Sequence, residues 1–180
     1  AAAVAQFNEI KPTIVAVMNE SFSDLSCFEQ LQAAGYTGPA FYNSLPDTLV
    51  RGTMLASVAG GGTANSEFEF LTGATTAFVG LGKIPYQLYQ MNSVNSLAKD
   101  LKELGYTTTA MHPQNPVNYH RDKIYQQLGF GDFLSIGDFE GAPCYHAGVC
   151  DYATYDKILD LLRTDEAPQF IFDVTMQNHG

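Results

Sequence analysis

The sequence contains no tryptophan, few positive charges and no long uninterrupted hydrophobic run. Its 9 lysine and arginine residues face 19 aspartate and glutamate residues, which gives a formal net charge of -10. Non-specific nucleic-acid binding needs a basic surface, so this balance argues against nucleic acid as a partner. It does not argue against an anionic substrate, because a bound divalent cation can reverse the local field.

No apolar stretch approaches the roughly 20 residues of a membrane-spanning helix, and no charged segment leads into a signal-peptide pattern. The alanine-rich residues 1–5 are interpreted as a tail. The length of 180 residues suits one domain, residues 1–180, with a sizeable core. With 12 Phe and 10 Tyr, that core is expected to rely on aromatic packing.

Only three cysteines are present, and two of them, Cys144 and Cys150, bracket a short turn-rich segment. A local disulfide between them is the favoured interpretation and would indicate an oxidising compartment. Two reduced thiols, or a zinc site that adds His146, are the alternatives. Cys27 is left over and is expected to be a small buried hydrophobic residue.

Apolar β-branched runs alternate with helical patterns, which predicts an α/β fold with a mostly parallel sheet flanked by helices. Strands are expected at residues 12–18, 106–111, 133–136 and 169–176, the first and last of them buried. Helices are expected at residues 25–34, 63–71, 92–104, 119–128 and 151–163. Residues 41–43 and 48–58 are expected to be extended, and residues 77–91 to form a long loop.

Polar residues follow three of the predicted strands, namely Glu20, His112 and His179. The carboxyl ends of parallel strands meet at one edge of a sheet, where α/β proteins bind their ligands. Glu20 is therefore a candidate metal ligand, with an exposed acid at a helix start as the alternative. For the two histidines, the alternative is a purely structural role.

Three glycines at residues 60–62 come directly before Thr63 and a helical pattern. Glycine permits positive φ and a close approach to the backbone. The N-terminus of a helix favours negative charge, so a hydroxyl there is well placed as a nucleophile, metal ligand or phosphoryl acceptor. The alternative is that Thr63 or Asn65 only caps the helix.

Five short motifs occur in one order along the chain. They are Asn19-Glu20-Ser21-Phe22, Gly61-Gly62-Thr63-Ala64, Ala110-Met111-His112, Tyr119-His120-Arg121-Asp122 and Asn178-His179-Gly180. In this order they resemble the lipoteichoic acid synthase group of phosphoglycerol transferases, within the sulfatase and alkaline phosphatase superfamily. The resemblance covers residues 11–180 and implies the N-terminal part of a sulfatase-like extracellular catalytic domain.

The resemblance implies a role for six residues. Thr63 corresponds to the nucleophile that takes up a glycerophosphate group, and Glu20 together with Thr63 to ligands of Mn²⁺ or Mg²⁺. The residues that correspond to substrate-binding positions are His112, Tyr119, Arg121 and His179. Tyr119 stands where the synthases carry a tryptophan, and Arg121 beside Asp122 has a surface ion pair as its alternative.

The implied activity is metal-dependent transfer of phosphoglycerol from a phosphatidylglycerol-type lipid, for lipoteichoic acid or a related glycerophosphate polymer. It places the protein at the cell surface, held to the membrane by an anchor outside this sequence. A phosphoethanolamine transferase, or another sulfatase-like hydrolase, is the alternative within the same fold. A sulfatase is disfavoured because no cysteine lies in a Cys-x-Pro-x-Arg setting.

One departure from the family pattern affects both the metal site and the sheet. The family's metal site also uses an Asp-His pair, and no such dipeptide occurs here. The resemblance therefore implies a partner, the C-terminal half of the domain, and a sheet with an unpaired apolar edge. A non-catalytic binding module or inactive fragment is the alternative from another functional class.

Overall fold

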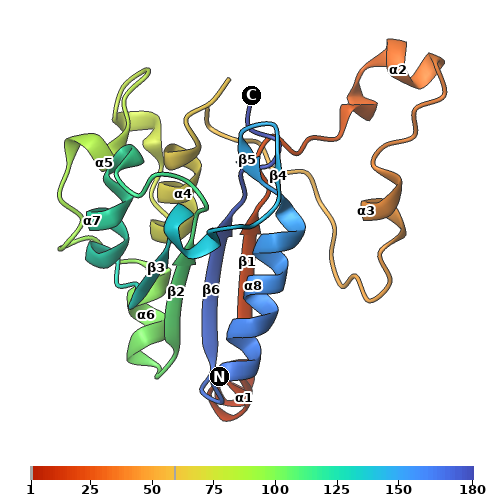
Figure 1. Ribbon diagram of the computed structural model, residues 1–180. Coiled ribbons are helices and arrows are strands. Elements are labelled where there is room, and N and C mark those ends of the chain that lie inside the picture. The colour runs from red at the N-terminus through yellow and green to blue at the C-terminus, as the bar shows by residue number, and fades with distance from the viewer. Residues whose placement is uncertain (1, 59) are drawn as a thin grey trace.

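A four-stranded parallel sheet forms the centre of the protein in a computed structural model that describes residues 2–58 and 60–180 (Figure 1). The strand order is β1-β6-β2-β3, and each neighbouring pair is parallel. The strands are β1 (Ile14–Met18), β2 (Thr107–Met111), β3 (Asp132–Leu134) and β6 (Gln169–Val174). The predicted α/β fold with a mostly parallel sheet is confirmed.

Helices flank this sheet on both faces. They are α1 (Ala2–Ile10), α2 (Glu29–Ala33), α3 (Ala40–Ser44), α4 (Thr63–Thr72), α5 (Pro85–Leu88), α6 (Leu97–Glu103), α7 (Arg121–Gln127) and α8 (Asp151–Thr164). Short 3₁₀ turns occupy Leu25–Cys27, Thr76–Phe78, Asn118–His120 and Ile136–Phe139, and β4 (Cys144–Tyr145) pairs with β5 (Gly148–Val149) as a small antiparallel hairpin. In the part of the chain that is described, no helix is long and apolar enough to cross a bilayer.

The central strand β6 is buried along its whole length because helices cover both of its faces. Alternate residues of a strand point to opposite faces. Phe170 and Phe172 join one core with α4, α6 and α7, whereas Ile171 joins a second core with Ile158 of α8. The C-terminal end of β6 is therefore held from both sides.

Strand β1 lies at the edge of the sheet and is only half buried, which corrects the prediction of a buried strand. It pairs with β6 on one side, and Val15 and Val17 remain 41% and 42% exposed. An apolar run therefore identifies this strand correctly, while its burial depends on neighbours that the run does not specify. Since β1 is the last strand in the order, its other backbone edge has no strand partner among the described residues.

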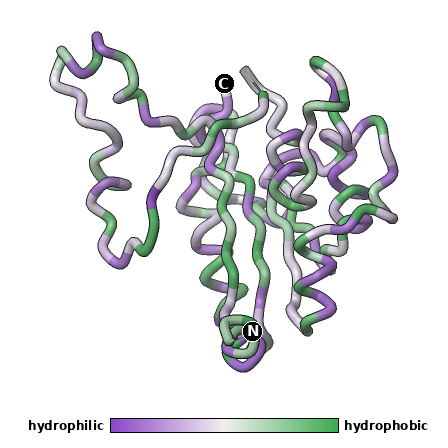
Figure 2. Tube along the Cα trace, turned by 180° about the vertical axis from the view of Figure 1, so that it is seen from behind, coloured by the Kyte–Doolittle hydropathy of each residue, from purple (hydrophilic) through white to green (hydrophobic). Residues whose placement is uncertain are grey.

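Three predictions about the first 60 residues are wrong. Residues 2–10 form helix α1 instead of a tail, and Ala1 lies outside the described residues. Residues 41–43 lie in α3, and residues 48–58 contain no strand. The segment that carries α2 and α3 extends away from the sheet in both views (Figure 1, Figure 2). Because it has no neighbouring strand there, its β-like composition finds no ladder partner.

Two further corrections concern a helix start and the cysteines. The helix predicted at residues 92–104 begins only at Leu97, because the Ser96 hydroxyl caps it by accepting from the Lys99 amide. No disulfide links Cys144 and Cys150, since Cys144 pairs with Val149 in the hairpin while Cys150 turns away to start α8. Cys27 is exposed rather than buried.

The described residues contain no group of three metal-ligating side chains around Cys144, His146 and Cys150, so the zinc alternative is not supported. Helix α8 and strands β2 and β6 lie where the sequence predicts them. Helices α4 and α7 also lie within or close to their predicted ranges. These five elements carry or support most of the candidate site.

Asp173 is a carboxyl group buried inside the sheet. It lies on β6 with no exposed surface, and neither side-chain oxygen has a hydrogen-bond partner among the described residues. Burial, with a smaller contribution from Asp151, raises the pKa of Asp173 from 3.8 to about 7. The native state therefore keeps this proton at pH values where the unfolded chain has released it.

We expect Asp173→Asn to weaken the pH dependence of stability. Between about pH 4 and pH 7 the unfolded state binds fewer protons than the native state at this site, so wild-type stability falls as pH rises. The asparagine variant lacks this contribution, and its advantage over wild type should grow across the same window. Urea denaturation at several pH values measures it, with exposed Asp156→Asn as the control. An unchanged pH profile in Asp173→Asn would contradict the assignment.

Candidate active site

The six candidate residues line one cavity of about 440 Å³ at the C-terminal edge of the sheet. They are Glu20 after β1, Thr63 at the start of α4, His112 after β2, Tyr119 in a 3₁₀ turn, Arg121 at the start of α7 and His179 after β6. The prediction that the strand ends and the threonine turn meet is confirmed. Parallel strands produce this meeting because all their carboxyl ends lie at one edge.

The hydroxyl of Thr63 contacts the carboxylate of Glu20. Thr63 Oγ1 donates to Glu20 Oε2 at 3.1 Å. The Glu20 backbone is fixed in turn, because its N–H donates to the hydroxyl of Thr175 at 3.0 Å. Glu20, which follows the edge strand β1, thereby bonds both to the residue after the central strand β6 and to the first residue of α4.

Thr63 does not cap its helix, so the capping alternative is wrong. The N-cap residue is Gly62, at φ 78°, so the helix has no side-chain cap at its N-terminus. Gly60 and Gly61 also have positive φ, 68° and 109°, a region that other residues enter only with strain. The glycine run therefore turns the chain sharply and leaves the Thr63 hydroxyl free to contact Glu20.

Glu20 and Thr63 offer two oxygen donors to a cation. Carboxylate and hydroxyl oxygens are the donor type that Mg²⁺ and similar hard cations prefer. Among residues 2–58 and 60–180 there is no cluster of three or more His, Cys, Asp or Glu side chains that would complete a site. The oxygen atoms present thus fit a divalent metal in chemistry, and Glu20 and Thr63 would hold part of its coordination sphere.

His112 is a buried, neutral histidine. It is 3% exposed, and its Nδ1 lies 2.9 Å from the Val174 carbonyl oxygen. A carbonyl only accepts, so Nδ1 carries the proton and Nε2 keeps its lone pair. Burial, reinforced by the positive charge of Arg121, lowers the pKa of His112 to about 4. Near neutral pH this side chain accepts a hydrogen bond and is a poor proton donor.

Arg121 forms a buried ion pair with Glu67, a residue that the sequence analysis did not single out. Arg121 Nη2 and Nε lie 2.5 Å and 3.2 Å from the two carboxylate oxygens of Glu67. Tyr125 donates its hydroxyl to the same carboxylate at 2.8 Å. Arg121 is only 1% exposed, so a surface pair with Asp122 is excluded.

The ion pair joins two helices that line the cavity. Glu67 lies one helical turn after Thr63 on α4, and Arg121 is the first residue of α7. Burial is the largest effect on the pKa of Arg121 and acts to lower it, but the charge and hydrogen bonds of Glu67, with a further contribution from Tyr125, together raise it by more, so the guanidinium stays charged. No pattern in the sequence separates Glu67 from Glu69, which is why its role emerges only from the structure.

Tyr119 and His179 complete the wall with different degrees of constraint. Tyr119 is partly buried with a positive φ of 55°, and Arg121 Cζ lies 5.0 Å from the centre of its ring. This cation–π contact fixes the ring beside the cavity. His179 is exposed, and its N–H donates to the Met176 carbonyl at 3.2 Å.

Known proteins share this fold and sequence pattern. The sulfatase family pattern matches residues 12–180. The lipoteichoic acid synthase LtaP from Listeria monocytogenes superposes with a TM-score of 0.72 at 19% identity, covering 94% of this chain and 41% of that one. The phosphoglycerol transferase GacH of Streptococcus pyogenes, solved with sn-glycerol-1-phosphate, gives a TM-score of 0.69 at 25% identity, covering 99% of this chain and 51% of that one.

A curated relative is the putative cyclic β-1,2-glucan modification protein of Rhizobium meliloti (strain 1021). It is 32% identical over 170 residues, which are 94% of this chain and 26% of the relative. The chain thus spans about a quarter of that protein and about half or less of the two solved structures.

The fold and the edge of the sheet at which the candidate residues meet define an alkaline phosphatase-like α/β domain. Because the family pattern covers nearly the whole chain, the chain belongs to the sulfatase family. Its structural neighbours LtaP and GacH confirm the resemblance to phosphoglycerol transferases.

We expect Glu67→Gln to destabilise the protein strongly. The change leaves the buried Arg121 charge without a counter-charge, which typically costs about 3–5 kcal/mol. The matched control is Asp160→Asn, which breaks the exposed Asp160–Arg163 pair and should cost at most about 1 kcal/mol. Urea denaturation measures both. Equal, small losses in the two variants would show that the buried pair does not hold α4 against α7.

Proposed function

We propose that this chain carries the nucleophile of a metal-dependent phosphoglycerol transferase, with Thr63 as the group that takes up glycerophosphate. The single observation that carries the proposal is the Thr63–Glu20 contact of 3.1 Å at the start of a helix that faces a cavity. A threonine hydroxyl is a weak nucleophile until its proton is removed. The contact places a carboxylate, and any cation that it holds, on the oxygen that must be activated.

The proposed first step is attack of Thr63 Oγ1 on the phosphorus of a phosphatidylglycerol-type lipid. A Thr63 O–P bond forms, the bond from phosphorus to the diacylglycerol oxygen breaks, and the threonine proton ends on that leaving oxygen. A divalent cation held by Glu20 and Thr63, Mn²⁺ or Mg²⁺, would lower the pKa of the hydroxyl and neutralise phosphoryl charge. The N-terminus of α4 stabilises the same negative charge.

The remaining residues have distinct proposed roles. His112 accepts a hydrogen bond from a glycerol hydroxyl through Nε2, because its Nδ1 proton is committed and its pKa is about 4. Arg121 donates hydrogen bonds to Glu67 from Nε and Nη2, so we propose that Nη1 contacts the phosphate. In the structure Nη1 donates to the Asn118 carbonyl at 3.4 Å. Tyr119 and exposed His179 are proposed to close over the glycerol.

The relatives support this proposal in two ways. GacH was solved with sn-glycerol-1-phosphate, which is the group we propose to be transferred here. The Rhizobium meliloti relative is named for the modification of a cyclic β-1,2-glucan, so the acceptor need not be a lipoteichoic acid. We also propose that the reaction takes place at a membrane surface, because its donor is a lipid, and that this surface faces the cell exterior.

Removal of the nucleophile should abolish turnover. We expect Thr63→Ala to lower diacylglycerol release from phosphatidylglycerol by at least about 10³-fold in the intact protein. Thr63→Ser keeps a hydroxyl and should retain measurable release.

Glu20→Gln should weaken activation by added Mn²⁺, so that more metal is needed for half-maximal rate. Thr53→Ala, in an exposed loop, is the control.

A Thr63→Ala variant with wild-type release would remove Thr63 from the mechanism. A protein that binds glycerophosphate but releases no diacylglycerol with any divalent metal would instead favour the non-catalytic binding module.

A further inference from the structure

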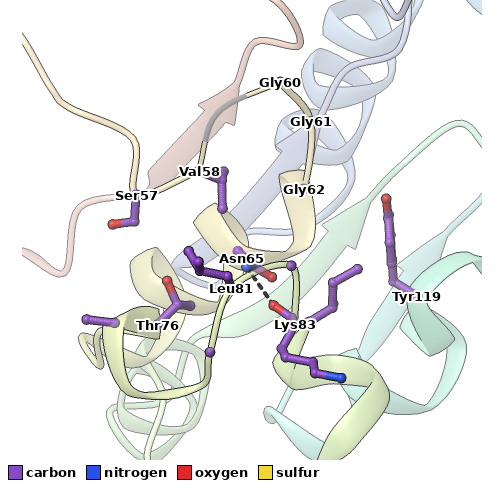
Figure 3. Close-up of a pocket in the computed structure, with 14 residues that line it drawn as sticks. Ser57, Val58, Gly60, Gly61, Gly62, Asn65, Thr76, Leu81, Lys83 and Tyr119 are labelled. Carbon is purple, nitrogen blue, oxygen red and sulfur yellow. Dashed lines mark hydrogen bonds between the residues drawn. The ribbon is translucent and has the colours of Figure 1, made fainter.

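A second, larger cavity of about 700 Å³ adjoins the candidate active site. Figure 3 shows residues that line the larger cavity, among them Gly61, Gly62 and Tyr119. The same three residues line the candidate active site, so the two cavities meet beside Thr63. Ligand sites in proteins commonly have volumes of about 300–1,000 Å³. The second cavity therefore has room for a molecule larger than the glycerophosphate group.

The walls of the second cavity are fixed by the carboxylate of Glu69. Ser57 donates its hydroxyl to Glu69 Oε2 at 2.6 Å, and Thr76 donates both its amide and its hydroxyl to Glu69 Oε1 at 2.6 and 2.7 Å. These bonds tie the loops on either side of α4 to that helix. The cavity is thus a built feature whose two walls are joined through one side chain.

Much of the wall is bare backbone. Gly80 and Gly82, at φ 101° and 67°, face the cavity together with the glycine turn before Thr63. Peptide groups without side chains let a ligand approach closely and offer it both N–H donors and C=O acceptors. A cavity of this kind suits a ligand that carries many hydroxyl groups.

Asn65 presents an unpaired acceptor in the same wall. The side chain is 7% exposed, and its Nδ2 donates to the Lys83 carbonyl at 3.0 Å. Its Oδ1 is buried and has no hydrogen-bond partner among the described residues. Leaving such an acceptor unpaired is unfavourable, so a ligand hydroxyl that donates to it would be favoured. Figure 3 shows the Lys83 side chain pointing away from Asn65.

The described wall of the cavity carries a single charge, which is positive. No carboxylate is among the described residues that line the cavity, and Lys83 is their only charged side chain. The Tyr119 ring adds an aromatic surface of the kind that packs against the apolar face of a sugar ring. Val58, Leu81 and Ile84 add apolar side chains to the same wall. Bare peptide groups, one unpaired amide oxygen and these apolar and aromatic surfaces match a carbohydrate, which has both hydroxyl groups and apolar ring faces, whereas the single positive charge of Lys83 offers little to a polymer with many negative charges.

We propose that this cavity binds the acceptor of the transferase, an uncharged carbohydrate, and that Asn65 accepts a hydrogen bond from one of its hydroxyls. The inference rests on the proposed function of Thr63. In the second half-reaction a hydroxyl oxygen of the carbohydrate attacks the phosphorus on Thr63. A new phosphoester bond forms, the bond to Thr63 Oγ1 breaks, and the proton of the attacking hydroxyl ends on that oxygen.

Binding without turnover tests the site independently of the chemistry. The probe is a cyclic β-1,2-glucan, titrated calorimetrically into the intact protein. We expect Ala77→Trp, which fills the cavity from an exposed position, to weaken binding by at least about tenfold. Ala74→Trp is the matched control, since both alanines are exposed and both donate their amide to a threonine hydroxyl two residues earlier.

Asn65→Leu is a second variant that removes the amide with little change in volume, and it should also weaken glucan binding. Thermal melts establish that each variant is folded. No glucan binding by the wild-type protein, or equal binding by Ala77→Trp and Ala74→Trp, would overturn the proposal. Preferential binding of a glycerol phosphate oligomer at this cavity would overturn it as well.

Turnover separates this proposal from the function on which it rests. In Ala77→Trp we expect the first turnover, one diacylglycerol released per Thr63, to keep its wild-type rate in a rapid-quench experiment, while transfer to the glucan falls at least about tenfold. If the wild-type protein binds the glucan but shows neither diacylglycerol release nor transfer to the glucan, the transferase is refuted and the carbohydrate site is retained. Normal transfer in Ala77→Trp would refute the acceptor site and leave the transferase standing.

Discussion

The buried ion pair between Glu67 and Arg121 is the interaction on which the candidate site depends. It joins α4, which begins with Thr63, to α7, which begins with Arg121 itself. Separating a pair that is buried away from water leaves an uncompensated charge on each partner, which is strongly unfavourable. The pair therefore keeps the two helices together. Through its contact with Tyr119, the same guanidinium also fixes the ring that both cavities share.

The end of β6 provides the second constraint. The Val174 carbonyl sets the tautomer of His112, and the next residue, Thr175, holds the backbone of Glu20. One strand end thus positions His112, which we propose to accept a hydrogen bond from the substrate, and the segment that carries Glu20, the proposed metal ligand. These contacts therefore rest on a strand that is buried along its length and packed on both faces.

The sequence predicts the site better than it predicts the surroundings. Strand ends and a glycine turn are local signals, and parallel topology converts them into spatial proximity, which brought Glu20, Thr63 and His112 together. Glu67 and Asn65 carry no local signal, because burial and missing partners arise only from tertiary packing. The same reasoning explains the wrong disulfide and residues 48–58, where register and neighbouring strands decide the outcome.

The most direct test of the account is the chemical state of Thr63 during turnover. The intact protein is incubated with phosphatidylglycerol and a divalent metal, quenched in acid within the first turnovers, digested and analysed by tandem mass spectrometry. The account predicts one glycerophosphoryl group, located on the side-chain oxygen of Thr63. Lipid consumption with that group on another residue, or with no covalent adduct at any time point, would contradict it.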